Sequence, residues 1–171
     1  MSEPNRYYGI YRGSVVNNID PMQMGRIMVT VPDVGGAIPS TWAMPCVPFA
    51  GKKMGAFMVP QVGAGIWVQF EGGDPDYPVW ISCWWGQSAD LPSLALAGVP
   101  ADPNLVLQSM LQNVIVISDL LGPTGGITLQ STTGASIIVN DTGVYIKNGK
   151  GASIQMVGTT VTINSGALVV T

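Results

Sequence analysis

Histidine is absent from the 171-residue sequence, and charged residues are scarce. Without histidine, the chain lacks the commonest general base and the commonest metal ligand. Only 10% of the residues are charged, whereas typical soluble domains have about 25%. A soluble monomer with so few charges would struggle to cover its surface, so the composition favours burial in an oligomer or a larger assembly.

Basic patches and long apolar runs are also missing. The seven lysines and arginines are scattered, only Lys52 and Lys53 are adjacent, and the net charge is −3. A nucleic-acid-binding domain usually has a basic patch, so we expect no nucleic-acid partner. No run reaches the roughly 18 apolar residues of a membrane span. Residues 1–13 lack the apolar core of a signal peptide, which predicts assembly in the producer's cytoplasm.

The sequence has two cysteines, Cys46 and Cys83, and both lie in apolar, strand-like stretches. Disulfides are rare in proteins that are made without a leader. We therefore expect two buried free thiols.

The chain divides into two compositions. Twelve of its thirteen aromatic residues lie in residues 1–85, and Tyr145 is the exception. Residues 113–171 hold four charged residues and are rich in Gly, Ser, Thr, Asn and β-branched residues. Several prolines interrupt residues 86–112, between the two regions. We therefore expect a head at 1–88, a neck at 89–112 and a separate structure at 113–171.

The head is predicted to be all-β, with five short strands separated by Gly- and Pro-rich turns. The expected strands are Tyr8–Val16, Arg26–Val31, Trp42–Val47, Ile66–Phe70 and Val79–Trp85. Such a set favours a small barrel; an oligonucleotide/oligosaccharide-binding (OB) barrel is one solution, and an SH3-like barrel is another. In the neck, Asp102-Pro103 could begin a short helix reaching Gln112, or the segment could be extended.

The final sixty residues contain a string of very short strands with glycine turns. The expected strands are Val114–Ile117, Ile127–Leu129, Ile137–Val139, Val144–Ile146, Ile154–Met156, Val161–Ile163 and Leu168–Val170. Each has an apolar-x-apolar pattern, which gives one narrow apolar face. A single ribbon of such strands cannot enclose a core, so we predict that three identical ribbons share one. A single-chain β-roll or adhesin stalk is the alternative.

Three blocks of the head carry a family resemblance. Residues 18–32 read NIDPMQMGRIMVTVP, and residues 42–45 and 55–63 read WAMP and GAFMVPQVG. The most specific block is FEGGDPDYP at residues 70–78. Together they resemble phage baseplate assembly protein V and the VgrG-like central spikes of type VI secretion. The glycine-punctuated tail is similar to the spike repeats that follow the barrel in that family.

The resemblance implies a non-enzymatic homotrimer with an OB-fold barrel followed by a trimeric intertwined β-helix (β-prism) spike. It implies a phage tail or other contractile injection particle, in which the spike leads the inner tube and touches the target envelope transiently. The OB head would join a separate baseplate hub protein. No cofactor is expected. The alternative is an oligosaccharide-binding OB module on a trimeric stalk.

The motif residues are expected to have structural roles. They are Asp20, Pro21, Gly25, Arg26, Pro32, Trp42, Pro60, Gly63, Phe70, Glu71, Gly72, Gly73, Asp74, Pro75 and Pro78. Gly25 and Gly63 suit turns with positive φ, Asp20 and Asp74 can cap turns, and Pro60 and Pro78 suit strand margins. Residues 72–75 read as a tight turn.

The sequence offers little for catalysis. The acidic cluster of Glu71, Asp74 and Asp76 contains the residue types of a glycosidase carboxylate pair or of a calcium site. Nothing else would build a sugar cleft, and the spacing fits no standard calcium loop. We therefore interpret the cluster as a solvated turn.

The five tryptophans and the C-terminal end are the remaining candidates for contact. Trp42, Trp67, Trp80, Trp84 and Trp85 are expected to anchor the barrel or its subunit contacts. The family's metal-clamping histidine tip is missing, and the sequence ends in a strand-like stretch, Leu168, Val169, Val170 and Thr171. We expect these residues to contact a separate tip protein of the PAAR type, or to form an exposed blunt end.

Overall fold

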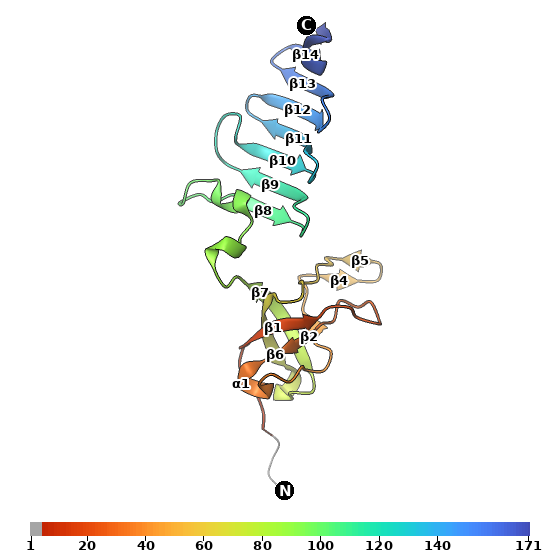
Figure 1. Ribbon diagram of the computed structural model, residues 1–171, viewed down its shortest axis with the longest axis vertical. Coiled ribbons are helices and arrows are strands. Elements are labelled where there is room, and N and C mark those ends of the chain that lie inside the picture. The colour runs from red at the N-terminus through yellow and green to blue at the C-terminus, as the bar shows by residue number, and fades with distance from the viewer. Residues whose placement is uncertain (1–4) are drawn as a thin grey trace. The chain divides into compact units, whose positions relative to one another are not determined.

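The computed structural model describes residues 5–171 as two compact units, Met1–Ser88 and Ala89–Thr171, each built from strands (Figure 1). Within the described residues one short α-helix and four 3₁₀ turns interrupt the strands. The predicted all-β class is confirmed. Each unit is described separately below.

The first unit is a curled five-stranded sheet in the order β2-β1-β6-β7-β3. Its strands are β1 (Tyr11–Asn17), β2 (Met28–Thr30), β3 (Met44–Pro45), β6 (Gly65–Phe70) and β7 (Pro78–Trp84). The β3–β7 pair is parallel and the others are antiparallel. Ile27 and Ala43 form a bridge beside β2 and β3, which links the two ends of the sheet into a barrel.

The barrel buries its own core. Alternate residues of β6 point inward, so that Ile66, Val68 and Phe70 are buried while the residues between them are not. Val15 from β1 and Val29 from β2 complete the same layer. These are the apolar positions that the sequence pattern assigned to strands.

The connection between β2 and β6 contains two elements that the sequence pattern did not predict. Helix α1 (Pro32–Gly35) begins with a proline, which is favoured in the first turn because its missing N–H is not needed there. The hairpin of β4 (Ala50–Gly51) and β5 (Met54–Gly55) turns at Lys52-Lys53. Two-residue strands leave no alternation for a sequence pattern to detect.

Both cysteines are free, and both are exposed, so the expectation of buried thiols is wrong. Strand β3 ends before Cys46. Cys83 lies near the end of β7, beyond a register shift opposite Trp67 and Val68 of β6. Partial burial nevertheless raises the pKa of the Cys83 thiol, which disfavours its reactive thiolate.

The turn η2 (Ser88–Asp90) spans the boundary between the units, and the 3₁₀ turn η3 (Ser93–Leu96) and strand β8 (Leu105–Gln108) follow in the second unit. A helix over 102–112 is therefore wrong, and the extended alternative is correct. Because β8 pairs with β9, strand pairing begins inside the segment 89–112 that the sequence assigned to the neck.

Seven more strands follow, one for each strand predicted in the tail. They are β9 (Val114–Ser118), β10 (Gly126–Gln130), β11 (Ala135–Asn140), β12 (Gly143–Asn148), β13 (Ser153–Val157), β14 (Thr160–Ile163) and β15 (Leu168–Val170). From β8 to β15 the strands lie in chain order in one antiparallel sheet (Figure 1). This open meander does not fit the single-chain β-roll that was the alternative.

Glycine is required where β10 begins. Gly126 has φ 84°, and a Cβ there would overlap the carbonyl oxygen of Val139 on the neighbouring strand β11. Gly134 in the next turn has the same φ of 84°, but its nearest neighbour, the Gly149 Cα, is 3.9 Å from where a Cβ would lie.

These two glycines give a matched pair of variants. Gly134→Ala should cost about 1–2 kcal/mol, the penalty of a left-handed backbone alone. Gly126→Ala should cost clearly more, because β10 and β11 must also move apart. Thermal unfolding of the two variants checks the difference. Equal destabilisation would contradict the described packing of β10 on β11.

Candidate functional site

The second unit carries a continuous aliphatic surface, which we call the apolar ladder. Each adjacent pair of strands has at least two pairs of directly opposite apolar residues. In the β11–β12 pair, for example, Ile137 lies opposite Ile146 and Val139 lies opposite Val144. Direct cross-strand partners share one face of a sheet. The ladder consists of Leu105, Leu107, Ile115, Ile117, Ile127, Leu129, Ile137, Val139, Val144, Ile146, Ile154, Met156, Val161, Ile163, Leu168 and Val170.

The apolar ladder is largely uncovered in the single chain. Ile127 is 49% exposed and Val139 is 43% exposed, although both lie in mid-sheet. Soluble proteins rarely leave a contiguous apolar surface of this size open unless it is an interaction site. The single-layer sheet has no second layer with which to cover it, so cover must come from another chain.

The opposite face of the sheet differs in composition. Its central column runs through Thr128, Tyr145, Gln155 and Thr162, interspersed with aliphatic residues. The Tyr145 hydroxyl lies 2.8 Å from the Thr142 hydroxyl. Thr128, Gln155 and Thr162 therefore lie opposite the apolar ladder, as the apolar-x-apolar pattern predicted. The sheet is two-sided, and only one side is wholly aliphatic.

Side-chain amides and carboxylates hold the turns of this meander. Asn140 Oδ1 accepts hydrogen bonds from the backbone N–H of Thr142 at 3.0 Å and of Gly143 at 3.1 Å. The Asp141 carboxylate accepts from the Gly122 N–H at 3.0 Å. The Asn140 bonds form an Asx turn, whereas the Asp141 bond joins two loops, and both fix the loop ends and so the strand register.

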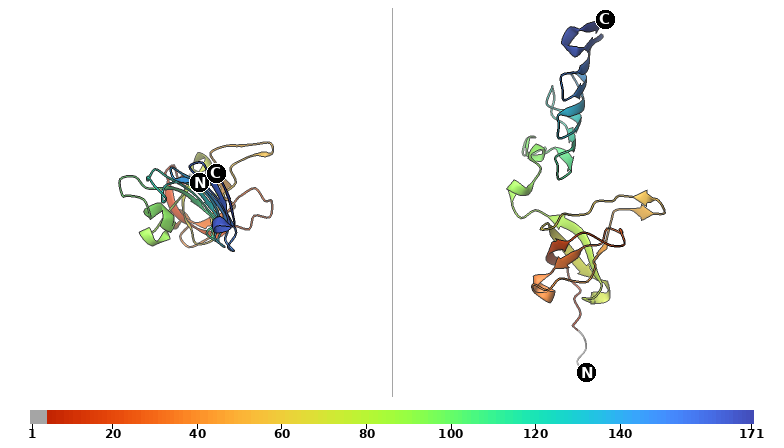
Figure 2. Two further views of the ribbon diagram at one scale, coloured as in Figure 1. Left: turned by 90° about the horizontal axis from the view of Figure 1, so that it is seen from above. Right: turned by 45° about the vertical axis from the view of Figure 1, so that its right-hand side comes forward.

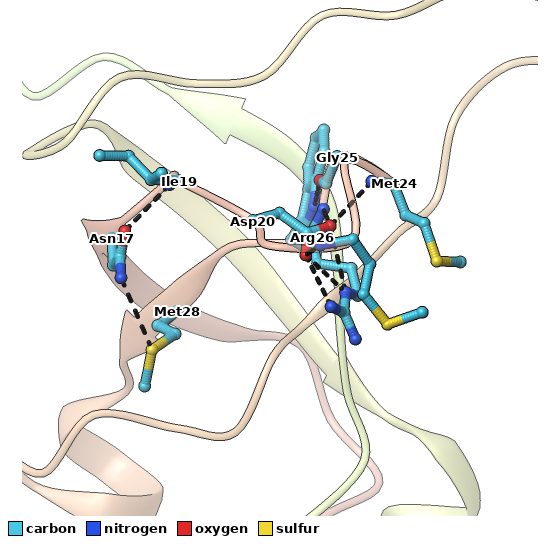
Figure 3. A network of polar contacts seen from close by, with 9 residues as sticks. Asn17, Ile19, Asp20, Met24, Gly25, Arg26 and Met28 are labelled. Atoms are coloured by element: carbon cyan, nitrogen blue, oxygen red, sulfur yellow. Dashed lines mark hydrogen bonds and ion pairs between the residues drawn. The ribbon is translucent and has the colours of Figure 1, made fainter.

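The first unit contains a buried ion pair between Asp20 and Arg26 (Figure 3). Asp20 Oδ1 lies 2.6 Å from Arg26 Nη2, and its side chain is 3% exposed. The carboxylate also accepts backbone N–H bonds from Met22 at 3.0 Å, Met24 at 2.8 Å and Arg26 at 3.2 Å. One carboxylate therefore organises the whole loop from residue 20 to residue 26.

The electrostatics of the pair follow from this geometry. The Arg26 guanidinium holds the pKa of the Asp20 carboxyl well below its usual range, and backbone N–H groups add to the effect while burial opposes it. Asp20 in turn raises the pKa of Arg26. Both groups are charged at every physiological pH, so the pair is a structural clamp rather than a proton donor or acceptor.

Tryptophans attach this loop to the barrel. Trp80, which is buried, donates its Nε1–H to the Gly25 carbonyl at 3.1 Å. The Arg26 guanidinium lies over the Trp42 ring, 5.5 Å from its centroid. Gly25 has φ 77°, and the Phe57 ring edge would lie 3.2 Å from a Cβ there.

The segment 70–78 forms the turn between β6 and β7. Glu71 begins a 3₁₀ turn (η1, Glu71–Gly73), and the Asp74 N–H donates to the Glu71 carbonyl at 3.0 Å. Asp74 Oδ1 accepts from the Asp76 N–H at 3.1 Å, while Oδ2 pairs with Arg6 at 3.0 Å. Gly72 and Gly73 have φ of 57° and 75°. Among residues 5–171, no group of three or more Cys, Asp or Glu could hold a metal ion.

The remaining motif residues lie apart from this turn. Pro21 follows Asp20 in the clamped loop, Pro32 begins α1 and Pro78 begins β7. The Pro60 carbonyl accepts from Asn18 Nδ2 at 3.0 Å. Gly63, with φ 86°, donates its N–H to the Val15 carbonyl at 2.9 Å.

An aromatic cluster that the sequence did not reveal lies on the other face of the barrel wall. The Arg12 guanidinium is 5.3 Å from the Trp67 ring and 5.1 Å from the Trp84 ring. Arg12 is directly opposite Trp67 in the β1–β6 register. Such pairing depends on register, which no local motif encodes. Trp85, by contrast, is 64% exposed.

Comparison with known families matches both units. Residues 11–85 match the type VI secretion system/phage-baseplate injector OB domain. Residues 104–169 match the phage baseplate V C-terminal trimerisation domain. The chain belongs to the baseplate V family. A search of the curated proteins found no match.

Membership of the baseplate V family identifies a trimeric, non-enzymatic structural protein of the phage-baseplate or type VI spike type. The barrel is an OB domain, so the SH3-like alternative is wrong. The chain is a component of a phage tail or injection particle. No helix among residues 5–171 is long and apolar enough to cross a membrane.

The trimerisation match covers the strands that carry the apolar ladder. The baseplate V chain therefore forms a homotrimer through the unit whose aliphatic face is open. The expected tip residues lie at the far edge of this sheet, where β15 pairs with β14 alone, and Leu168, Val169 and Val170 are each about half exposed.

The Asp20–Arg26 pair predicts an acid-sensitive head. Because the folded-state pKa of Asp20 lies below the unfolded value of about 3.9, unfolding takes up a proton below about pH 4. The stabilisation should be complete above that pH and decline as the pH falls toward 2. Asp20→Asn should be less stable at pH 7 and should lose less on acidification. Thermal unfolding between pH 7 and pH 2 checks this; parallel curves for both proteins would contradict it.

Two neighbouring residues on opposite faces of β13 test the ladder. Ile154→Asp places a carboxylate in the shared core, where an unpaired buried charge costs at least several kcal/mol. This variant should lose the trimer. Gln155→Asp, on the opposite face, should retain it. Sedimentation velocity distinguishes the two outcomes, and a stable Ile154→Asp trimer would show that the ladder is not the trimer interface.

Proposed function

We propose that three baseplate V chains wind their apolar ladders around one axis to form a β-helical (β-prism) spike at the tip of an inner tube. The observation that carries the proposal is the unbroken ladder from β8 to β15, two aliphatic residues wide on every strand. Three narrow faces can close a triangular core, with the mixed polar and aliphatic face of each sheet outward.

The dimensions of the second unit suit a slender shaft. Neighbouring strands are about 4.8 Å apart, so the eight strands extend over roughly 34 Å. Backbone hydrogen bonds run along this direction between strands, and the ladder packs continuously beside them. A shaft of this kind resists bending, which supports a mechanical role in which sheath contraction drives the tip through a target envelope.

The low charge of the tail fits the same role. Residues 113–171 contain four charged residues, and Ser, Thr, Asn and Gln provide most of the polar surface. An outer surface without charge clusters makes few ionic contacts with an envelope as it passes. We assign residues 1–88 as the head, the segment after Ser88 as the neck, and the ladder strands as the shaft.

The two ends of the chain are proposed to bind different partners. The OB head would join a separate hub protein of the baseplate. A PAAR-type tip protein would contact Leu168, Val169, Val170 and Thr171, the first three of which form the edge strand β15 and are about half exposed. The aromatic cluster does not favour the oligosaccharide-binding alternative, because the Arg12 guanidinium lies over the Trp67 and Trp84 rings.

Electron cryomicroscopy of assembled particles tests this function. A gold-binding tag at the N-terminus should mark the distal end of the inner tube, at one site per particle. Particles that lack this chain should fail to initiate tubes or to penetrate target cells. A label along the sheath, or on the fibres, would contradict the proposal.

A further inference from the structure

Two surface hollows of the head have mainly apolar linings. The first, of about 540 Å³, lies beside the β4–β5 hairpin and is lined by Met24, Met44, Met54, Phe57 and Met58, with Lys53 as its one charged residue. The second, of about 260 Å³, is lined by Val34, Ile38, Phe70 and Pro75, with Asp76 as its one charged residue. The two hollows therefore have opposite charge.

We call residues 49–58 the arm; it touches the barrel of its own chain where the Phe57 ring lies beside Gly25, but much of its apolar surface is exposed. Strands β4 and β5 form a sheet of two strands that stands out from the barrel (Figure 2). Phe49 is 54% exposed, Met54 65% and Phe57 72%. A two-stranded hairpin is marginal in water unless another surface supports it. Methionine-rich surfaces adapt readily to a partner's shape, so the arm is suited to docking.

We propose that the arm of each head packs against the second hollow of the next head in the trimer, forming a ring of three identical contacts. Lys52 and Lys53 of one subunit would face Asp76 and the exposed Glu71 of its neighbour. Met54 and Phe57 would contact Ile38, which is 75% exposed. This contact lies outside the trimerisation domain, and it depends on the trimer that this domain forms.

Symmetry favours a second copy as the occupant. In a closed trimer with threefold symmetry, each subunit uses two different patches, one for each neighbour. The arm and the second hollow are two such patches, and their charged residues have opposite signs. The trimerisation domain also tethers the three heads, which raises their effective concentration to about the millimolar range for short linkers. A weak apolar contact is then sufficient.

The charges would orient the contact more than strengthen it. Exposed ion pairs contribute little energy, but opposite charges select the partner patch and its register. Two arms would repel each other through their lysines, and two second hollows would repel through their carboxylates. The pattern therefore disfavours symmetrical arm-to-arm pairing.

Engineered thiols in the full-length chain test the ring. Lys53→Cys and Asp76→Cys are combined in a Cys46→Ser, Cys83→Ser background and oxidised mildly. The expected product on a denaturing, non-reducing gel is a covalently closed trimer, because each subunit bonds to both neighbours. Single-chain bands would overturn the proposal, since the arm would then contact its own head or another protein.

Two controls make the result specific. The pair Lys53→Cys with Ser82→Cys, at an exposed position outside both hollows, should give no closed trimer. Native mass spectrometry before oxidation separates failure of the ring from failure of the trimer. Lys53→Cys alone should give no covalent dimer, and a dimer would indicate arm-to-arm contact and contradict the proposal.

A second measurement needs no substitution. Trimers assembled from mixed ¹⁴N and ¹⁵N chains are treated with a carbodiimide, which joins lysine amines to nearby carboxylates without a spacer. Peptides linking Lys52 or Lys53 to Glu71 or Asp76 between labelled and unlabelled chains are expected. Links within one chain only, or none, would overturn the proposal. Ile38→Lys, which places a positive charge opposite the lysines of the arm, should abolish the links to Glu71 and Asp76 between chains while the native mass remains that of a trimer.

Discussion

A one-layer sheet cannot bury its own aliphatic face, and the rest of this molecule follows from that constraint. The meander from β8 to β15 places two aliphatic residues of each strand on one side and satisfies its backbone hydrogen bonds within the sheet. What remains unsatisfied is the exposed ladder, for example Ile127 and Val139. In the proposed spike, association of three chains removes that surface from water, so trimer formation and the folding of this unit would be one energetic event.

The OB head buries the apolar face of its sheet within one chain. Its curled sheet closes on itself and buries Val15, Ile66 and Val68 within one chain. The scarce charges are used where backbone N–H groups need an acceptor, as Asp20 shows by organising its loop and pairing with Arg26. Removing either partner alone would leave a desolvated charge, so Asp20 and Arg26 stabilise the loop as a pair. The head thus forms its core from one chain, whereas the proposed core of the tail needs three chains.

The sequence revealed the tail better than the head. Seven tail strands were predictable because the apolar-x-apolar pattern indicates both a strand and its apolar face. This pattern is local and does not depend on which strands pair. Strand β8 was ambiguous because Asp102-Pro103 also resembles a helix start, and its pairing with β9 decides the matter. The β4–β5 hairpin, the Arg12 stack on two tryptophans and the exposure of Cys83 all depend on register or on loops, which local sequence does not encode. Asp20 was predictable as a turn cap, but its bond to Arg26 depends on the path of the loop.

The most direct test of the account is the native mass of the full chain over a dilution series. Light scattering or native mass spectrometry should give three times the chain mass of 17.9 kDa, and the trimer should persist into the low micromolar range. Below the concentration at which it dissociates, the strand signal of the second unit should disappear with the trimer. A single subunit at micromolar concentration that is well folded and resists proteases would contradict the account, because its apolar ladder would then be stable in water.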